Sequence, residues 1–297
     1  MVYDLVIVGT GPAGLTAGVY AGRYMLNTVI IGSQPGGTIA EAHKVCNFPT
    51  YKDITGIELS QKLTEQAQEN AEISYGTVKS IRKGTTGFEL VTDSKTYKAK
   101  KVILAHGRKK RKLNAKGENE FLGKGVSYCA TCDGAFFKDK AVAVVGGSDA
   151  ALTAALLLAE YAKKVYIVYR KNRFFRAEPL WVRKVEENSI IEPVFNSQVT
   201  EIKGSDFVEK VILDSGELNV DGIFIEIGYD PDETLTEQLG LEMEKGYIVT
   251  DKNQRTSVHG VFAAGDGTNN PLKQAVTAAA EGAIAASSAY QELMEEN

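Results

Sequence analysis

The stretch Tyr3–Gly14 reads YDLVIVGTGPAG, and it decides the fold of the first part of the chain. Its first six residues form a largely apolar run of strand length, and a helical stretch, Leu15–Arg23, follows the glycines. Gly9, Gly11 and Gly14 have the Gly-x-Gly-x-x-Gly spacing of a dinucleotide-binding motif in its required strand–turn–helix context. The first glycine allows the tight turn, the second lets the backbone approach a pyrophosphate, and the third lets helix and strand pack closely. We expect the phosphates at the helix N-terminus, where free N–H groups and the helix dipole attract anions.

A second strand–turn–helix pattern begins at Ala141. The apolar strand Ala141–Val145 leads into the turn GGSDAA at residues 146–151, and a helical stretch follows. Ser148 stands where a middle glycine normally lets the backbone meet the pyrophosphate. Asp149 adds a negative charge near the expected phosphates, or else caps the helix. This pattern predicts a second nucleotide site with an altered turn.

The strand tips of the two halves differ in charge. In the second half, the strand that follows the motif ends in Tyr169, Arg170 and Lys171, with Arg176 nearby. An acid at this position favours NAD, whereas basic residues accommodate the 2′-phosphate of NADP, so we predict NADPH; the alternative is ordinary surface charge. In the first half the equivalent strand ends in Gly32-Ser33-Gln34 rather than in an acid, so Ser33 or Gln34 must replace the usual contact to a ribose hydroxyl.

Between the two motifs lies Cys129-Ala130-Thr131-Cys132-Asp133-Gly134. A Cys-x-x-Cys pair is able to close a disulfide and to reopen it by thiol–disulfide exchange. Asp133 follows the second cysteine directly, in a position to exchange a proton with a thiolate. The alternatives are a structural disulfide and a zinc half-site. Zinc would need further ligands, and the remaining candidates are Cys46, His43, His106 and His259.

Composition narrows the class of protein. The length of 297 residues suggests two domains, because single domains usually run to ~100–200 residues. A formal net charge of −4 argues against a nucleic-acid binder, and no apolar run approaches the ~18 residues of a membrane span. The N-terminus enters a strand at once, so we see no signal peptide, and three cysteines fit a reducing cytoplasm. The basic run Arg108–Lys112 is either a solvated connector or a docking surface for an acidic partner.

The C-terminal part carries a second set of candidate cofactor residues. The strand Val261–Ala264 ends in Gly265-Asp266-Gly267, which places an acid where it can meet a sugar-alcohol hydroxyl. A helix is expected from Pro271 to about Leu293, with Lys273-Gln274-Ala275 at its beginning. A helix N-terminus stabilises negative charge such as that on N1 of a reduced flavin.

Taken together, these features resemble the low-molecular-weight thioredoxin reductases over essentially the whole chain. The most specific element is the Cys129–Gly134 segment just before the second glycine motif. The other matching elements are Gly9–Gly14, Gly36-Gly37, Asn47 with Pro49, Gly265-Asp266, Lys273–Ala275, and the basic segment from Tyr169 to Arg176, which has one extra residue.

The resemblance implies an α/β fold of two nested Rossmann-like dinucleotide-binding domains, each in three layers. An FAD domain, discontinuous in sequence, would comprise residues 1–115 and 245–297. An NADPH domain with the redox disulfide, residues 116–244, would be inserted in it. The resemblance further implies a homodimer, and a swivel that presents the disulfide and the nicotinamide to the flavin in turn. The partner would be thioredoxin or a glutaredoxin-like protein.

The resemblance also assigns roles to residues. Cys132 would be the sulfur next to the flavin, Cys129 would attack the thioredoxin disulfide, and Asp133 would be the proton donor. The residues expected to contact FAD are Gly9, Gly11, Pro12, Ala13, Gly14, Ser33, Gly36, Gly37, Thr38, Asn47, Val78, Gly107, Gly265, Asp266, Lys273, Gln274 and Ala275. The residues expected to bind NADPH are Gly147, Ser148, Asp149, Ala150, Tyr169, Arg170, Lys171 and Arg176. No metal is expected.

Departures from the family pattern keep other functions open. Cys46 replaces an acid, Thr38 replaces a glutamine, and His106 takes a threonine position near the expected flavin. Ser148 alters the NADPH turn, and some relatives with an altered NADPH site use other reductants. The family resemblance and the basic strand tip still favour an NADPH-dependent thioredoxin-disulfide reductase. The alternatives are the same relay fed by ferredoxin or a reduced deazaflavin, a dithiol oxidase that uses oxygen, and a non-catalytic redox sensor that binds FAD and signals through its disulfide. Under any of these functions we expect Cys46 to be a buried spectator thiol.

Overall fold

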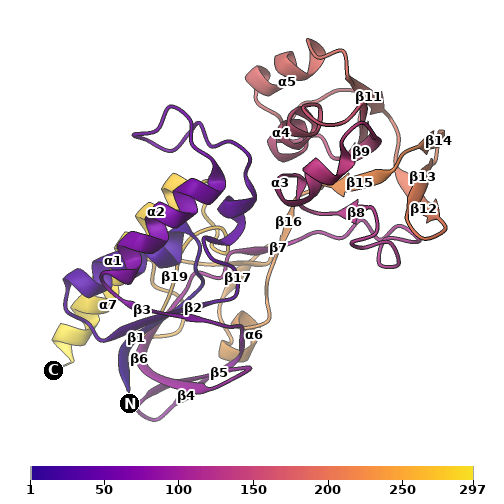
Figure 1. Ribbon diagram of the computed structural model, residues 1–297. Helices are drawn as coiled ribbons and strands as arrows, with labels where there is room; N and C mark the ends of the chain where they lie inside the picture. Colours follow the sequence, from indigo (N-terminus) through magenta and orange to yellow (C-terminus); the bar gives the residue numbers. More distant parts are fainter. Residues whose placement is uncertain (1, 297) are drawn as a thin grey trace. The chain divides into compact units, whose positions relative to one another are not determined.

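A computed structural model describes residues 2–296 and divides them into two compact units. Unit 1 comprises residues 2–40, 45–109 and 231–296, and unit 2 comprises residues 41–44 and 110–230. Unit 2 is thus inserted in the sequence of unit 1, as the colours of Figure 1 show. The main divisions fall after Lys109 and Asp230, earlier in the chain than the positions 115 and 244 suggested by the sequence.

Unit 1 is built on a sheet with β1 at its centre, because the apolar run of β1 can be buried on both faces. Strands β2 and β6 pair with β1 in parallel, so that Ile7 lies opposite Ile30 on one side and Ile103 on the other. The order β3-β2-β1-β6 continues in parallel to β19 at the end of β6, and the antiparallel hairpin β4–β5 pairs with the start of β6. The strands are β1 Tyr3–Val8, β2 Thr28–Gly32, β3 Glu72–Tyr75, β4 Val78–Gly84, β5 Gly87–Thr92, β6 Thr96–Leu104, β17 Met243–Glu244, β18 Tyr247–Ile248 and β19 Val261–Ala263.

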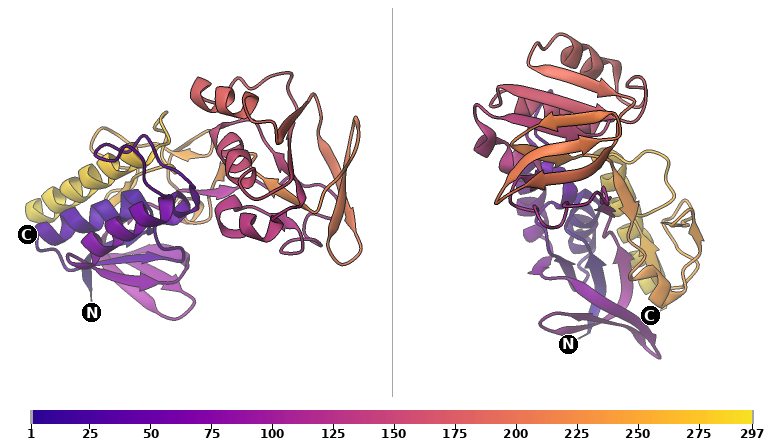
Figure 2. Two further views of the ribbon diagram at one scale, coloured as in Figure 1. Left: turned by 45° about the horizontal axis from the view of Figure 1, so that its top comes forward. Right: turned by 90° about the vertical axis from the view of Figure 1, so that its right-hand side faces the viewer.

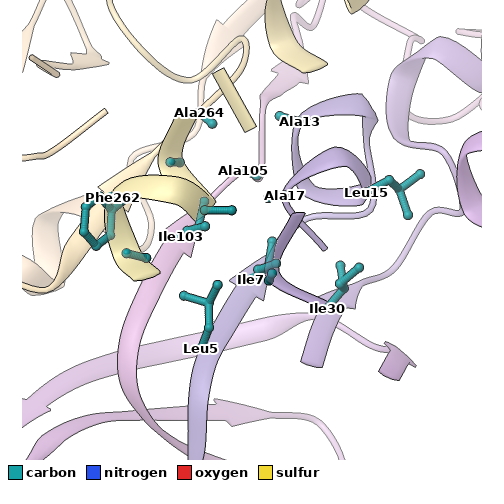
Figure 3. Packing of buried hydrophobic residues seen from close by; sticks show 14 of the residues in the cluster. Leu5, Ile7, Ala13, Leu15, Ala17, Ile30, Ile103, Ala105, Phe262 and Ala264 are labelled. Carbon is teal, nitrogen blue, oxygen red and sulfur yellow. The ribbon is translucent and has the colours of Figure 1, made fainter. Parts of the chain in front are cut away.

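The alternation of side chains along β1 divides the core of unit 1 into two layers. Leu5 and Ile7 face the helices, together with Phe262 of β19, and Figure 3 shows Ile7 close to Ala17 of α1 in this cluster. Val6 and Val8 face the opposite side, where the segment after β16 supplies Leu235, Leu241 and Ile248. The helices and 3-10 turns of unit 1 are α1 Pro12–Arg23, η1 Gly37–Glu41, α2 Gly56–Gln68, α6 Thr236–Leu239 and α7 Ala275–Glu295.

Helices α1, α2 and α7 lie side by side on one face of this sheet (Figure 2). The end of α7 is fixed to the sheet by buried charges. Glu292 accepts from Lys101 Nζ at 3.2 Å and from Arg255 Nε at 2.8 Å. Two opposite charges compensate the carboxylate, which would otherwise be costly to bury. These contacts hold the long C-terminal helix against β6.

Unit 2 repeats the same plan with a different third layer. Its parallel sheet has the order β11-β10-β9-β15-β8, and a small antiparallel sheet, β12-β13-β14, covers one face. Val142 and Val144 of β9 face α4 and α5, whereas Ala143 and Val145 face the small sheet. The elements are β8 Val126–Ser127, α3 Ala130–Asp133, η2 Gly134–Phe137, β9 Ala141–Val145, α4 Asp149–Leu158, β10 Lys164–Tyr169, α5 Pro179–Glu186, β11 Ile191–Phe195, β12 Val199–Gly204, β13 Val208–Leu213, β14 Gly216–Asn219 and β15 Gly222–Ile225.

The strand orders confirm the predicted fold. In each unit the third, second and first strands are followed by a strand from later in the chain, which is the order of a Rossmann-type sheet. The two short strands at the main divisions, β7 Arg108–Lys110 and β16 Tyr229–Pro231, pair with each other. None of the helices in residues 2–296 combines the length and the apolar run needed to cross a bilayer.

Candidate functional site

The first glycine motif forms a turn that admits no side chain at two positions. Gly9 has φ +122°, and a Cβ on it would meet the Ala105 carbonyl oxygen at 2.1 Å. A Cβ on Gly14 would lie 1.9 Å from the Gly9 carbonyl oxygen. The backbone of α1 is therefore drawn tightly against the ends of β1 and β6. This is the close helix–strand packing that the motif predicts.

A second glycine turn faces the first. A Cβ on Gly37 would approach Gly11 Cα at 2.9 Å, whereas a Cβ on Gly11 would meet no atom nearer than 3.9 Å. Gly11 is the N-cap of α1, no side chain caps this helix end, and its first turn carries no acid. The two turns form a cradle of bare backbone at a helix N-terminus, which is the environment that a pyrophosphate requires.

His106 supplies an acceptor beside this cradle. Its Nε2 donates to the Asp232 carbonyl oxygen at 3.0 Å, so Nδ1 carries the lone pair. Within residues 2–296, this buried Nδ1 has no hydrogen-bond partner. Burial lowers the pKa of His106 below its ordinary value, which keeps the ring neutral at pH 7. An orphaned acceptor next to the glycine turn fits a bound group that donates an N–H or O–H.

The C-terminal candidates gather at the end of β19. Asn47 Nδ2 donates to Gln274 Oε1 at 3.0 Å, which joins two residues of the predicted flavin set. Asp266 follows β19 and accepts from Arg108 Nε at 3.1 Å. Glu281 of α7, which the sequence did not single out, accepts from the Gly265 N–H at 2.6 Å and so fixes this turn. Burial raises the pKa of Glu281.

The expected start of the C-terminal helix at Pro271 was wrong. Helix α7 begins at Ala275, because Gln274 is extended at φ −132° and forms a capping box with Thr277. Lys273 therefore precedes the helix, where its Nζ donates to the Thr268 carbonyl oxygen and lies 4.4 Å from the ring centroid of Tyr247. Burial lowers the pKa of Lys273. It is held among carbonyl and aromatic groups rather than on the first turn of the helix.

The remaining predicted flavin residues are more dispersed. Ser33 and Thr38 are exposed, and Gly107 has φ +68° with open space around it. The side chain of Val78 is buried in the core on the far side of the sheet, so only its backbone is left to meet a ligand. Cys46 is an exposed free thiol, so the expectation of a buried spectator thiol was wrong.

In unit 2, Cys129 and Cys132 are joined as a disulfide with a Cα–Cα distance of 5.3 Å. Cys129 is the N-cap of the short helix α3, and the Cys132 N–H donates to its Sγ at 3.1 Å. Ser127, which the sequence did not single out, donates from Oγ to Asp133 Oδ2 at 2.6 Å. The acid beside the disulfide is thus held by a hydroxyl at the end of β8.

The second glycine motif also forms a tight turn. Gly146 has φ +150°, and a Cβ on Gly147 would meet the ring of Tyr169 at 2.4 Å. Ser148 is the N-cap of α4, and its side chain makes no capping hydrogen bond. The expectation that Asp149 caps the helix was wrong, because Asp149 Oδ1 accepts from the Glu178 N–H at 2.6 Å. Asp149 instead ties α4 to the segment that follows Arg176.

The basic cluster lies directly beyond β10. Arg170, Lys171 and Arg176 are exposed, and none has a carboxylate within ion-pair distance among residues 2–296. The Arg176 guanidinium lies 5.7 Å from the ring centroid of Phe175. Uncompensated guanidinium groups beside an open helix N-terminus fit a nucleotide that carries an additional phosphate.

A partly buried acid that sequence reasoning missed lies at the same sheet edge. Glu226 directly follows β15, and its backbone carbonyl oxygen would be 2.2 Å from a Cβ on Gly146. Burial raises the pKa of Glu226 to about 7, the charge of Lys110 opposes this shift, and the charge of Glu41 reinforces it. No alternation along β15 pointed to it, because all four residues of that strand are buried.

Glu226 should make the stability of the protein depend on pH. Its pKa is higher in the folded chain than in the unfolded chain, so folding favours the protonated form, and this stabilisation is lost as pH rises from about 4.5 to about 7. We expect Glu226→Gln to raise the free energy of unfolding at pH 8 by on the order of 2–3 kcal/mol, and to change it little at pH 4.5. Urea denaturation of both proteins at the two pH values checks this, with the exposed Glu217→Gln as control. An equal gain at both pH values would contradict it.

The basic run Arg108–Lys112 is not a free docking surface. Arg108 pairs with Asp266, Lys110 with Glu41, and Arg111 with Asp230 at 2.6 Å. Lys112 Nζ lies within 3.4 Å of Asn119 Oδ1. Arg108, Lys110 and Arg111 are thus paired with carboxylates of the same chain, which favours the alternative of a connector over that of a docking surface.

Comparison with known proteins places these features in a family. The family model described as pyridine nucleotide-disulphide oxidoreductase matches residues 3–282. The chain belongs to this family of oxidoreductases. The chain is 41% identical to the thioredoxin reductase of Bacillus subtilis, over 97% of this chain and 93% of that protein.

Solved structures agree with this membership. The thioredoxin reductase of Lactococcus lactis has a TM-score of 0.94 at 35% identity, with 99% of each chain covered. A ferredoxin-flavin thioredoxin reductase from Clostridium acetobutylicum has a TM-score of 0.56 at 35% identity, again with 99% of each chain covered. The similarity therefore extends over both units, and one of these similar proteins is named for ferredoxin as its electron donor.

Proposed function

We propose that this protein is a thioredoxin-disulfide reductase that passes electrons from NADPH, through FAD, to the Cys129–Cys132 disulfide and on to thioredoxin or a glutaredoxin-like protein. The observation that carries the proposal is the disulfide with Asp133 beside it, in a chain that also contains two glycine turns at helix N-termini. We assign FAD to unit 1 and NADPH, together with the redox disulfide, to unit 2. The full-length similarity to thioredoxin reductases supports this assignment.

The bare cradle of unit 1 suits FAD. The backbone at Gly11, Gly36 and Gly37 would hold the pyrophosphate, and Asp266 would meet the ribityl hydroxyls once it exchanges its partner Arg108 for them. The free Nδ1 of His106 would accept from the isoalloxazine or the ribityl chain. Bound FAD and NADPH would supply the hydride and two-electron chemistry that reduction of a disulfide requires.

The first experiment asks whether the chain holds FAD. We expect the purified protein to be yellow and to release FAD, rather than FMN, on denaturation. Gly11→Val should abolish this binding while the fold persists, because a Cβ at this position meets no protein atom nearer than 3.9 Å and the two methyl groups beyond it would occupy the cradle. A colourless protein that FAD cannot reconstitute would overturn the flavoprotein assignment.

The reduced cysteines would act in two exchange steps. The Cys129 thiolate attacks one sulfur of the thioredoxin disulfide, a mixed disulfide forms, and the released thioredoxin thiolate takes a proton from Asp133. The Cys132 thiolate then attacks Cys129 Sγ, which closes the protein disulfide and releases the second thioredoxin thiolate, protonated by solvent. Two electrons pass to thioredoxin in this sequence. The Cys132 N–H, which already points at Cys129 Sγ, favours negative charge on that sulfur.

Phe136 offers a contact for the protein substrate. It lies in η2, a few residues after Cys132, and is 75% exposed. A large exposed aromatic side chain next to a reactive group is typical of a protein-binding surface. We expect Phe136→Ala to raise the KM for thioredoxin about tenfold or more, as for other interface aromatics, and to leave the flavin spectrum unchanged.

Phe207 is a matched control for this substitution. It is also in unit 2 and is 64% exposed, but it lies in the turn before β13. Steady-state kinetics with thioredoxin should show no change for Phe207→Ala. If the two substitutions changed KM equally, or neither changed it, Phe136 would not belong to the substrate surface.

A second candidate function keeps the flavin and the disulfide but takes electrons from reduced ferredoxin. Two observations favour it as the alternative: Ser148 replaces a glycine in the nucleotide turn, and the similar Clostridium acetobutylicum protein is named as a ferredoxin-flavin thioredoxin reductase.

We place the protein in the cytoplasm as a homodimer, on the basis of its family and of its exposed thiol at Cys46, which suits a reducing compartment.

A further inference from the structure

Ser127 lies at the end of β8, between the sheet of unit 2 and the redox helix α3. It is 5% exposed. Its Oγ donates to Asp133 Oδ2 at 2.6 Å and accepts from the Cys129 N–H at 3.0 Å. One hydroxyl thus joins the acid that follows the second cysteine to the backbone of the first.

The donor and acceptor pattern fixes the direction of these bonds. A backbone N–H can only donate, so the Cys129 N–H occupies a lone pair of Ser127 Oγ and leaves the single O–H for an acceptor. The Asp133 carboxylate at 2.6 Å is much nearer to Oγ than the Cys129 carbonyl oxygen at 3.4 Å, so it takes this hydrogen bond. The Ser127 backbone is itself held by its place in the sheet, where it lies opposite Phe224 of β15. The hydroxyl therefore holds Asp133 from a rigid element rather than from the short helix that carries the cysteines.

We propose that Ser127 is a positioning residue, which holds the Asp133 carboxyl group where it exchanges a proton with the sulfur that leaves during thiol–disulfide exchange. This inference rests on the proposed role of Asp133. Without the hydroxyl, the Asp133 side chain is free to rotate away from the sulfurs, because no other side-chain hydrogen bond to it is present in the described part of the chain.

Reduction by dithiothreitol isolates this step from NADPH and thioredoxin. One dithiothreitol thiol gives its proton to the Asp133 carboxylate and attacks a sulfur of the Cys129–Cys132 bond, a mixed disulfide forms, and Asp133 passes the proton to the leaving protein thiolate. The second dithiothreitol thiolate then attacks its own mixed-disulfide sulfur, closes the cyclic disulfide and releases the other protein thiolate, which solvent protonates. Two electrons and two protons pass from dithiothreitol to the protein.

The test is a double-mutant cycle on the holoenzyme under anaerobic conditions. Samples mixed with dithiothreitol at pH 7 are quenched with acid, alkylated and weighed by mass spectrometry, which counts the free thiols over time. We expect Asp133→Asn to slow reduction about a hundredfold, as for loss of a general acid. Ser127→Ala should slow it about tenfold or more, as for loss of a hydrogen bond to a charged group. Adding Ser127→Ala to Asp133→Asn should cause no further loss.

Two controls separate positioning from general damage to the unit. Ser127→Thr keeps the hydroxyl and should react within about threefold of the wild type, well inside the effect of a lost hydrogen bond. Ser197→Ala removes another buried hydroxyl of unit 2, one that bonds Phe195 and Ser215, and should leave the rate unchanged. If Ser127→Thr fails to fold, the double-mutant cycle still shows whether Ser127 acts through Asp133.

Three results would overturn the inference: a Ser127→Ala rate equal to that of the wild type, an equal loss in Ser197→Ala, or a full additional loss when Ser127→Ala is combined with Asp133→Asn. Failure of the proposed function is distinguishable from all three. An enzyme that does not reduce thioredoxin would still show the cycle in dithiothreitol, because no nucleotide or protein substrate enters the assay.

Discussion

Replacing Cys132 with serine is expected to lower the rate of thioredoxin reduction at least about a thousandfold, as loss of a catalytic nucleophile does in other enzymes. A serine hydroxyl cannot form the intramolecular disulfide seen between Cys129 and Cys132. The variant would remain trapped after the first exchange step, as a mixed disulfide with thioredoxin. Non-reducing electrophoresis of the reaction mixture should show this adduct, and reduction with dithiothreitol should separate its two chains.

Cys46→Ser is the matched control. Cys46 is a free, exposed thiol outside the Cys129–Gly134 segment, so its replacement should leave the rate of thioredoxin reduction within about twofold of the wild type, as for most surface substitutions. Retention of full activity in Cys132→Ser would show that the disulfide is structural. Loss of activity in Cys46→Ser would show that a third thiol takes part.

Replacing Arg170 and Arg176 together with alanine is expected to raise the KM for NADPH about a hundredfold or more, as for loss of charge-assisted phosphate contacts. The value for NADH should change little, because NADH lacks the 2′-phosphate that these side chains would meet. Both guanidinium groups are exposed and have no carboxylate partner within the described residues, so nothing in the chain competes for them. Anaerobic titration of the flavin absorbance with each nucleotide measures the effect.

Arg183→Ala is the control for this pair. Arg183 lies in α5 of the same unit and faces Glu187, so its loss should not change the preference for NADPH. An equal loss of reduction by NADPH and NADH in the double variant would mean that the arginines support the fold of the segment rather than the phosphate. In that case the basic cluster would be ordinary surface charge.

The fold could be predicted because its determinants are local. Tyr3–Val8 and Ala141–Val145 are short apolar runs followed by glycines, and both form central parallel strands, as the family resemblance implied for the nested domains. The glycine turns could also be predicted, because they too depend on local sequence. A Cβ at Gly14 or Gly146 would collide with backbone within 3 Å, so these residue types carry their own geometry.

The parts that could not be predicted depend on partners far away in the sequence. Asp149 bonds the backbone of Glu178, which is 29 residues away, whereas the sequence pattern suggested either a charge near the phosphates or a local cap. The carboxyl group of Glu226 is only partly ionised at neutral pH, because burial and the charge of Glu41 raise its pKa against the opposing charge of Lys110. Helix α7 begins at Ala275 rather than at the predicted Pro271, because the capping box of Gln274 and Thr277 ends the helix there.

We propose that NADPH is the electron donor for reduction of thioredoxin through this disulfide. The most direct test of this claim mixes the FAD-loaded protein with thioredoxin and supplies NADPH, NADH or reduced ferredoxin in parallel, while free thioredoxin thiols are counted. We expect rapid formation of two thiols per thioredoxin with NADPH, far slower formation with NADH, and at most one thiol per enzyme molecule with any donor in Cys132→Ser. Thioredoxin that stays oxidised with millimolar NADPH, while reduced ferredoxin reduces it, would contradict the claim.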